Sequence, residues 1–185
     1  MERVLDASVH VFCERGFHGT SIADLTAATG LTGGSLYKAF ADKDAMYLAA
    51  VEHQSSQRNA QLQQVVDAAE SGRDKVRAAL EFYADLSTGA TGREGCLVVE
   101  TAVGIDALDE RAAAYARRAM EQRRTFFSDL IALGKADGSI PHHVETSAVS
   151  AMLLNLVQGM RVVGKTDPSR EAVASVVRSA LMLLN

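Results

Sequence analysis

Two short amphipathic segments joined by a glycine constrain the fold of this chain most. Thr20 or Ser21 can cap the first segment, and Gly30 can end it in the left-handed conformation. Thr32 can cap the second segment, which carries Leu36 and Phe40 on its inner side. Two short helices joined by a glycine-containing turn, with apolar residues where they meet, are the pattern of a helix-turn-helix.

The rest of the chain is also predicted to be α-helical. Apolar residues recur at helical spacing throughout, while only 2 prolines and 5% aromatic residues disfavour a β-sandwich or barrel. The glycine-rich segment 89–95 is predicted to be a loop, and residues 167 and 168 are predicted to cap and open the last helix. The sequence therefore predicts an all-α fold of nine helices, over residues 2–15, 20–29, 32–40, 42–69, 74–88, 96–105, 109–135, 143–163 and 168–184.

Composition excludes several other classes of protein. Two cysteines, Cys13 and Cys96, are too few for a disulfide framework, and we expect neither a secretory leader nor a membrane span. The chain has 185 residues with 19 Lys+Arg against 23 Asp+Glu, a net charge of −4, so any contact with nucleic acid must come from a local arrangement. A helical cytoplasmic protein remains.

Enzyme and cofactor signatures are absent from the sequence. It contains no His-Glu-x-x-His, no Gly-x-Ser-x-Gly and no phosphate-binding glycine loop between a strand and a helix. His142, His143 and Glu145 have the wrong spacing for metal ligands on one helix face and are interpreted as an exposed helix cap. We predict no enzyme, no cofactor and no metal, and a helical-bundle enzyme stays only as a third alternative.

Four segments of the first fifty residues carry one pattern without gaps: VLDA at 4–7, FCERGF at 12–17, TSIADL at 20–25 and TGLTGGSLYKAFADK at 29–43. This pattern resembles the amino-terminal signature of TetR-family transcriptional regulators. It implies a three-helix DNA-binding domain at residues 1–46 and a helical ligand-binding and dimerisation domain at residues 47–185. It also implies a homodimer, a double-stranded DNA operator and a small-molecule effector as partners.

The resemblance places the DNA contacts in the second and third helices. Small residues at the start of the third helix would also let its backbone approach DNA closely. The predicted DNA-binding residues are Ser21, Thr32, Gly33, Gly34, Ser35, Tyr37, Lys38 and Lys43. Gly33 stands where many members carry Lys, Ala39 is short, and we expect no basic arm before the first helix. These departures leave an alternative: a helical dimer that binds a small molecule or a protein and has weak or lost DNA binding.

An effector cavity is predicted among the helices that flank the glycine-rich segment. Its residues recur on the inward stripes of those helices and suit an apolar ligand that Tyr83, Glu100 and Asn155 could orient. The predicted ligand-binding residues are Phe82, Tyr83, Leu86, Cys96, Val99, Glu100, Met120, Phe127, Met152 and Asn155. The function predicted first is a repressor released from a palindromic operator by a small apolar ligand.

Cys96 and a group of arginines each allow two interpretations. Cys96 begins a helix after the glycine-rich segment. It is either a buried small residue or a thiol that the helix amino terminus makes reactive. The arginines at 111, 117, 118, 123 and 124 are interpreted as a solvated face rather than a nucleic-acid site.

Apolar stripes on residues 149–160 and 173–184 exceed what one neighbouring helix can cover. They predict a two-fold four-helix dimer interface with Gly159 in close contact.

Overall fold

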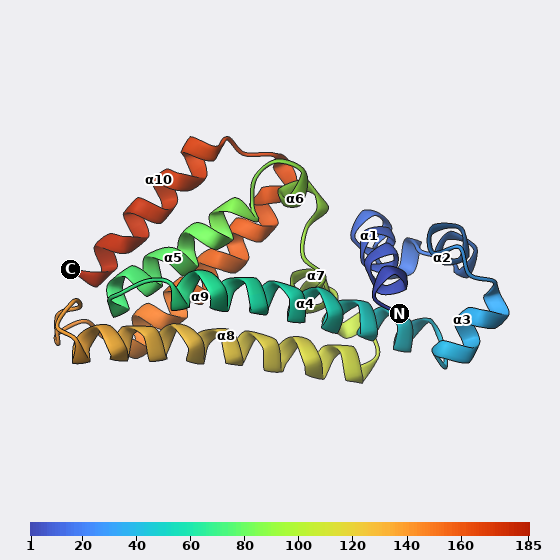
Figure 1. Cartoon of the computed structure of the whole chain (residues 1–185), viewed down its shortest axis with the longest axis horizontal. Coiled ribbons are helices and arrows are strands. Elements are labelled where there is room, and N and C mark those ends of the chain that lie inside the picture. The colour runs from blue at the N-terminus through green and yellow to red at the C-terminus, as the bar shows by residue number, and fades with distance from the viewer. The chain divides into compact units, whose positions relative to one another are not determined.

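The computed structural model describes residues 1–185, and all of its regular secondary structure is helical (Figure 1). The predicted all-α fold is confirmed, and each of the nine predicted helices is present. The α-helices are α1 (Glu2–Gly19), α2 (Ile22–Thr29), α3 (Gly33–Ala39), α4 (Lys43–Asp67), α5 (Gly72–Asp85), α6 (Gly89–Glu94), α7 (Leu97–Val103), α8 (Glu110–Ala136), α9 (Thr146–Val163) and α10 (Arg170–Leu181). Short 3₁₀ turns follow α7, α9 and α10 at Ile105–Ala107, Gly164–Thr166 and Met182–Leu184.

The chain forms two compact units. The first comprises residues 1–58 and 96–117, and the second comprises residues 59–95 and 118–185. Helices α4 and α8 therefore each contribute residues to both units. The predicted boundary after residue 46 divides the chain by function, and it stays a prediction.

An aromatic group holds the first unit together. The ring of Phe12 is fully buried, and it meets the Tyr47 ring edge-on with centroids 5.0 Å apart. Leu25 from α2 and Leu36 from α3 are buried in the same core, so the inner side predicted for α3 is confirmed at Leu36. Burial raises the pKa of Tyr47 to about 12, and its hydroxyl lies 3.0 Å from the hydroxyl of Thr101 in α7.

The helix ends of the first unit follow the predicted caps, with one difference. Gly30 ends α2 with φ 71, and Asp42 accepts a hydrogen bond from the backbone N–H of Ala45 at the start of α4. Gly16 leaves helical geometry with φ 68 and ψ 172, as a helix stop there requires. The residues after it form one more turn, so α1 reaches Gly19 with a kink inside it.

Helices α5, α9 and α10 pack together in the second unit (Figure 1). Their apolar sides share one core with the carboxyl-terminal half of α8, including Leu80, Phe127 and Leu153. Gly72 is required where α5 meets α8, because a Cβ there would lie 2.1 Å from the backbone nitrogen of Gly134.

Two predictions for the second unit are wrong in detail. Residues 89–94 form the short helix α6 instead of a loop, and the guanidinium of Arg161 in α9 donates hydrogen bonds to the carbonyls of Thr91 and Gly95 at its end. Asp167 does not cap the last helix. It adopts the left-handed conformation with φ 56, and Ser169 caps α10 by accepting from the N–H of Ala172.

One stretch, Thr146–Thr166, is long and apolar enough to cross a membrane by length and composition alone. The core helix of a globular protein passes the same test, and Leu153 and Val157 in this stretch are fully buried in the second unit. The stretch is therefore weak support for a membrane span.

Candidate nucleic-acid interface

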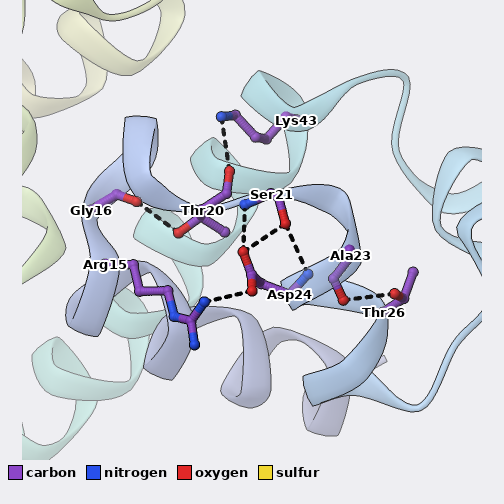
Figure 2. A network of polar contacts seen from close by, with 8 residues as sticks. All are labelled: Arg15, Gly16, Thr20, Ser21, Ala23, Asp24, Thr26 and Lys43. Atoms are coloured by element: carbon purple, nitrogen blue, oxygen red, sulfur yellow. Dashed lines mark hydrogen bonds and ion pairs between the residues drawn. The ribbon is translucent and has the colours of Figure 1, made fainter.

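The start of α2 is closed by a reciprocal cap (Figure 2). The backbone N–H of Asp24 donates to the Ser21 hydroxyl at 3.1 Å, and the Asp24 carboxylate accepts from the N–H of Ser21 at 2.8 Å. Arg15 of α1 lies 2.5 Å from the same carboxylate. Hydrogen bonds from Ser21 are the main cause that lowers the pKa of Asp24 below its usual value. Ser21 is exposed, as a predicted phosphate contact must be, but its hydroxyl already serves the cap.

Lys43 begins α4 and points back toward the end of α1. Its ammonium donates hydrogen bonds to the carbonyls of Phe17 at 3.0 Å and Thr20 at 3.1 Å, and Figure 2 shows the second of these. It also lies 4.2 Å from the centroid of the Phe17 ring. The sequence analysis predicted that Lys43 contacts a phosphate. Its internal partners lie more than twenty residues away along the chain, so no local sequence pattern indicated them.

The first turn of α3 presents backbone rather than side chains. The Thr32 hydroxyl caps the helix by accepting from the N–H of Ser35 at 3.2 Å. A Cβ added at Gly33 or at Gly34 would meet no protein atom within 4 Å. Packing within the protein therefore does not require glycine at either position, and the helix surface there is open to another molecule.

The second turn of α3 divides into an inner and an outer side. Leu36 is buried, whereas Tyr37 keeps 54% of its surface exposed. Lys38 and Ser35 are exposed as well. A large aromatic side chain left in solvent beside a cation and a hydroxyl can stack on or hydrogen-bond to a nucleic-acid backbone.

The predicted ligand-binding residues fall into both units, where most are buried or half-buried. Within the second unit, the Arg123 guanidinium lies 5.3 Å from the Tyr83 ring centroid and 5.6 Å from that of Phe126. It also donates a hydrogen bond to Asn59. Phe82, Leu86 and Met120 are half-buried, and Phe127 is fully buried. In the first unit, Val99 is buried and Glu100 and Cys96 are half-buried on or beside α7.

Met152 and Asn155 lie on an outer side of α9. Met152 is 50% exposed, and Asn155 lines an apolar groove of about 330 Å³ between α9 and α10, together with Gly159 and Val176. The sequence analysis assigned both residues to a cavity because they recur at helical spacing. Helical spacing identifies the apolar side of a helix but does not show which part of the chain packs against it.

The remaining sequence candidates have ordinary surroundings. Arg111 pairs with Asp109 just before α8, and Arg117 and Arg124 pair with glutamates on α8, as expected of a solvated face. Arg123 differs, because its guanidinium lies over the Tyr83 ring. His142 and His143 are exposed, and no group of three or more His, Cys, Asp and Glu residues could hold a metal ion. Cys13 is buried and Cys96 is half-buried, and neither forms a disulfide.

Comparisons with known proteins match both parts of the chain. The family model described as bacterial regulatory proteins, tetR family, matches residues 4–50. The model described as tetracyclin repressor-like, C-terminal domain, matches residues 72–180. The chain belongs to the TetR family. It is therefore a transcriptional regulator with a DNA-binding TetR fold, and the predictions of family and of a non-enzyme are confirmed.

Two named relatives, both transcriptional repressors, match this TetR-family chain over most of their length. The chain is 24% identical over 187 residues to the HTH-type transcriptional repressor ComR of Escherichia coli strain K12, which covers 98% of this chain and 87% of ComR. It is 25% identical over 184 residues to the repressor DhaR of Mycobacterium sp. strain GP1, covering 98% and 91%.

Solved structures show the same TetR fold. A cysteine mutant of the TetR-family regulator CifR, complexed with 26-base-pair operator DNA, matches with a TM-score of 0.83 and 26% identity over 98% of this chain and 95% of that one. The reduced form of E. coli NemR matches in fold with a TM-score of 0.84 and 19% identity over 100% and 96%.

Proposed function

We propose that this protein is a repressor that binds a palindromic operator through α3 and is released from it by a small apolar ligand. The observation that carries the proposal is the outer side of α3, where Tyr37 is 54% exposed and the two glycines before it face open space. An exposed aromatic beside bare backbone has no use in packing the chain itself. The relatives ComR and DhaR, both named repressors, favour repression over activation.

The proposed DNA contacts are those of the sequence analysis. Gly33, Gly34, Ser35 and Tyr37 face the groove, while Ser21, Thr32 and Tyr37 lie near phosphates. Lys43 is also expected near a phosphate, although its ammonium already donates to the carbonyls of Phe17 and Thr20. Lys38 adds charge at an exposed position. Because the chain is acidic overall, binding depends on this small set of groups and must weaken as the salt concentration rises.

We propose a homodimer formed through α9 and α10. The groove between them is lined almost entirely by apolar atoms, and Val163 and Val176 stand exposed at 53% and 39%. A second copy related by a two-fold axis can cover this apolar side and set two α3 helices on successive major grooves, about 34–36 Å apart.

The effector proposal keeps two sets of residues, one in each unit. In the second unit they are Phe82, Tyr83, Leu86, Met120 and Phe127, with Met152 and Asn155 on the outer side of α9. In the first unit they are Cys96, Val99 and Glu100. A ligand releases DNA only if it binds the DNA-free conformation more tightly, so tight binding by itself is insufficient.

The test is selection of duplexes from random DNA by the purified protein, followed by a ligand screen for their release. A palindromic sequence bound with strong salt dependence supports the proposal. A stable dimer that enriches no sequence would instead favour the alternative, in which the protein binds a small molecule or protein partner in the cytoplasm without an operator.

A further inference from the structure

Lys43 lies where three helix ends of the first unit meet. It is the first residue of α4, and it donates to the carbonyls of Phe17 in the last turn of α1 and of Thr20 just after it. Thr20 is buried and immediately precedes Ser21, the cap of α2. One side chain therefore joins the end of α1, the start of α2 and the start of α4.

The chemistry of these contacts suits a clamp, meaning that the Lys43 side chain holds the end of α1, the start of α2 and the start of α4 together. An ammonium has three N–H donors, and two of those of Lys43 are directed at carbonyls at a helix carboxyl terminus, where positive charge is favourable. The Phe17 ring lies 4.2 Å away, and Lys43 is only half-exposed. A lysine that mainly serves phosphate would extend into solvent, as the exposed Lys38 does.

The segment that contains α3 begins at α2 and ends at α4, the two helices whose starts Lys43 holds together. Residues 30–32 connect α3 to α2, and residues 40–42 connect it to α4, so each connection has only three residues. Because Lys43 ties the start of α4 to the start of α2, it limits how far α3 can turn on these short connections. We propose that Lys43 is a positioning residue for α3, and this inference rests on the proposed binding of DNA through that helix.

Positioning and phosphate contact predict different losses. Sequence is read through base edges, which need an exactly placed helix, whereas non-specific binding needs only charge near phosphates. A lost clamp therefore weakens binding to the selected duplex more than binding to a scrambled one. A lost phosphate contact weakens both alike and lowers the salt slope by about 0.9 for each contact, about 1.8 for the two copies of the proposed dimer.

The experiment compares the full-length protein with Lys43→Met, which keeps the aliphatic stem, and with Lys38→Met as the matched loss of an exposed charge. Affinity for selected and scrambled duplexes is measured at several salt concentrations. We expect Lys43→Met to reduce the ratio of the two affinities about five- to tenfold, with the salt slope nearly unchanged. Equal loss for both duplexes with a slope lower by about 1.8 per dimer, or no loss at all, would overturn the proposal.

Amide hydrogen exchange of the free protein provides a readout that needs no DNA. Faster exchange over residues 17–24 in Lys43→Met is expected, and unchanged exchange would overturn the clamp even if the parent enriches no operator. If Lys43→Met does not fold, Lys43→Arg replaces it. Arg keeps the charge for a phosphate but not the compact ammonium, so the clamp predicts a reduced ratio, and an unchanged ratio would overturn it.

Discussion

The carboxylate of Asp24 accepts hydrogen bonds from both the hydroxyl and the backbone N–H of Ser21, at 2.6 and 2.8 Å. This cap starts α2, the helix that supports α3 in the helix-turn-helix. It also gives the first unit a dependence on pH, because the pKa of Asp24 lies below its usual value of 3.8 in the folded protein. A group with a depressed folded pKa stabilises the protein above its unfolded pKa and ceases to do so as the pH falls through the folded one.

Replacing Asp24 with Asn should therefore lower the urea midpoint of unfolding at pH 7. The difference from the parent should shrink as the pH falls below 3.8, because the parent then loses the same ionised cap. Asp106→Asn, an exposed carboxylate with the same change of charge, is the control. A difference that stays constant from pH 7 to about pH 2 would show that ionisation of Asp24 does not contribute.

Tyr37→Ala should weaken DNA binding by about 1 kcal/mol for all sequences, because its hydroxyl and ring mainly serve the DNA backbone. The thermal midpoint should hardly change, since Tyr37 is 54% exposed and Leu36 supplies the packing of α3. Fluorescence anisotropy with a labelled duplex measures the affinity, and Val103→Ala, 80% exposed on α7, is the control. Unchanged affinity at several salt concentrations would remove α3 as the DNA-contacting helix.

Gly159→Glu should separate the proposed dimer without unfolding the chain. A Cβ at Gly159 meets no atom of its own chain within 4 Å, yet the position lines the apolar groove between α9 and α10. Burying an unpaired carboxylate against a second copy is strongly unfavourable. Sedimentation at micromolar concentration checks the prediction, with Val103→Glu as the control. A parent protein that sediments as a monomer would refute the proposed dimer directly.

Gly72→Ala should destabilise the second unit by about 1–3 kcal/mol, because the added methyl collides with the backbone of Gly134. Gly33→Ala makes the same chemical change where no atom lies within 4 Å. It should leave stability within about 0.5 kcal/mol of the parent. Denaturant unfolding of both variants tests the pair, and equal stability of the two would contradict the close approach of α5 and α8.

Cys96 should react with a thiol reagent before Cys13 does, since Cys96 is half-buried and Cys13 is buried. Mass spectrometry of partly alkylated protein identifies which thiol is modified first. The consequence for regulation is tested by adding an oxidant to the parent and to Cys96→Ser while following operator release. Identical release curves would eliminate the thiol route and leave the effector proposal to its ligand.

The sequence by itself determined the features whose causes lie within a few residues. The Thr32 cap, the left-handed Gly30 and the inward side of Leu36 were predicted correctly, and Ser21 was one of the two caps predicted for α2. Each depends on side chains and backbone groups no more than about four residues apart, so periodicity and residue type suffice. The open, glycine-rich start of α3 was visible for the same reason.

Tertiary structure decided the features that join distant parts of the chain. The Lys43 ammonium finds carbonyls 26 and 23 residues away, and Arg161 holds the end of α6 from 66 and 70 residues away. An apolar stripe such as that of α9 also does not show which element packs against it. Asn155, which was predicted to line a cavity, lies in a surface groove instead. Periodicity shows which side of a helix avoids water, but only packing settles what covers that side and which polar groups meet there.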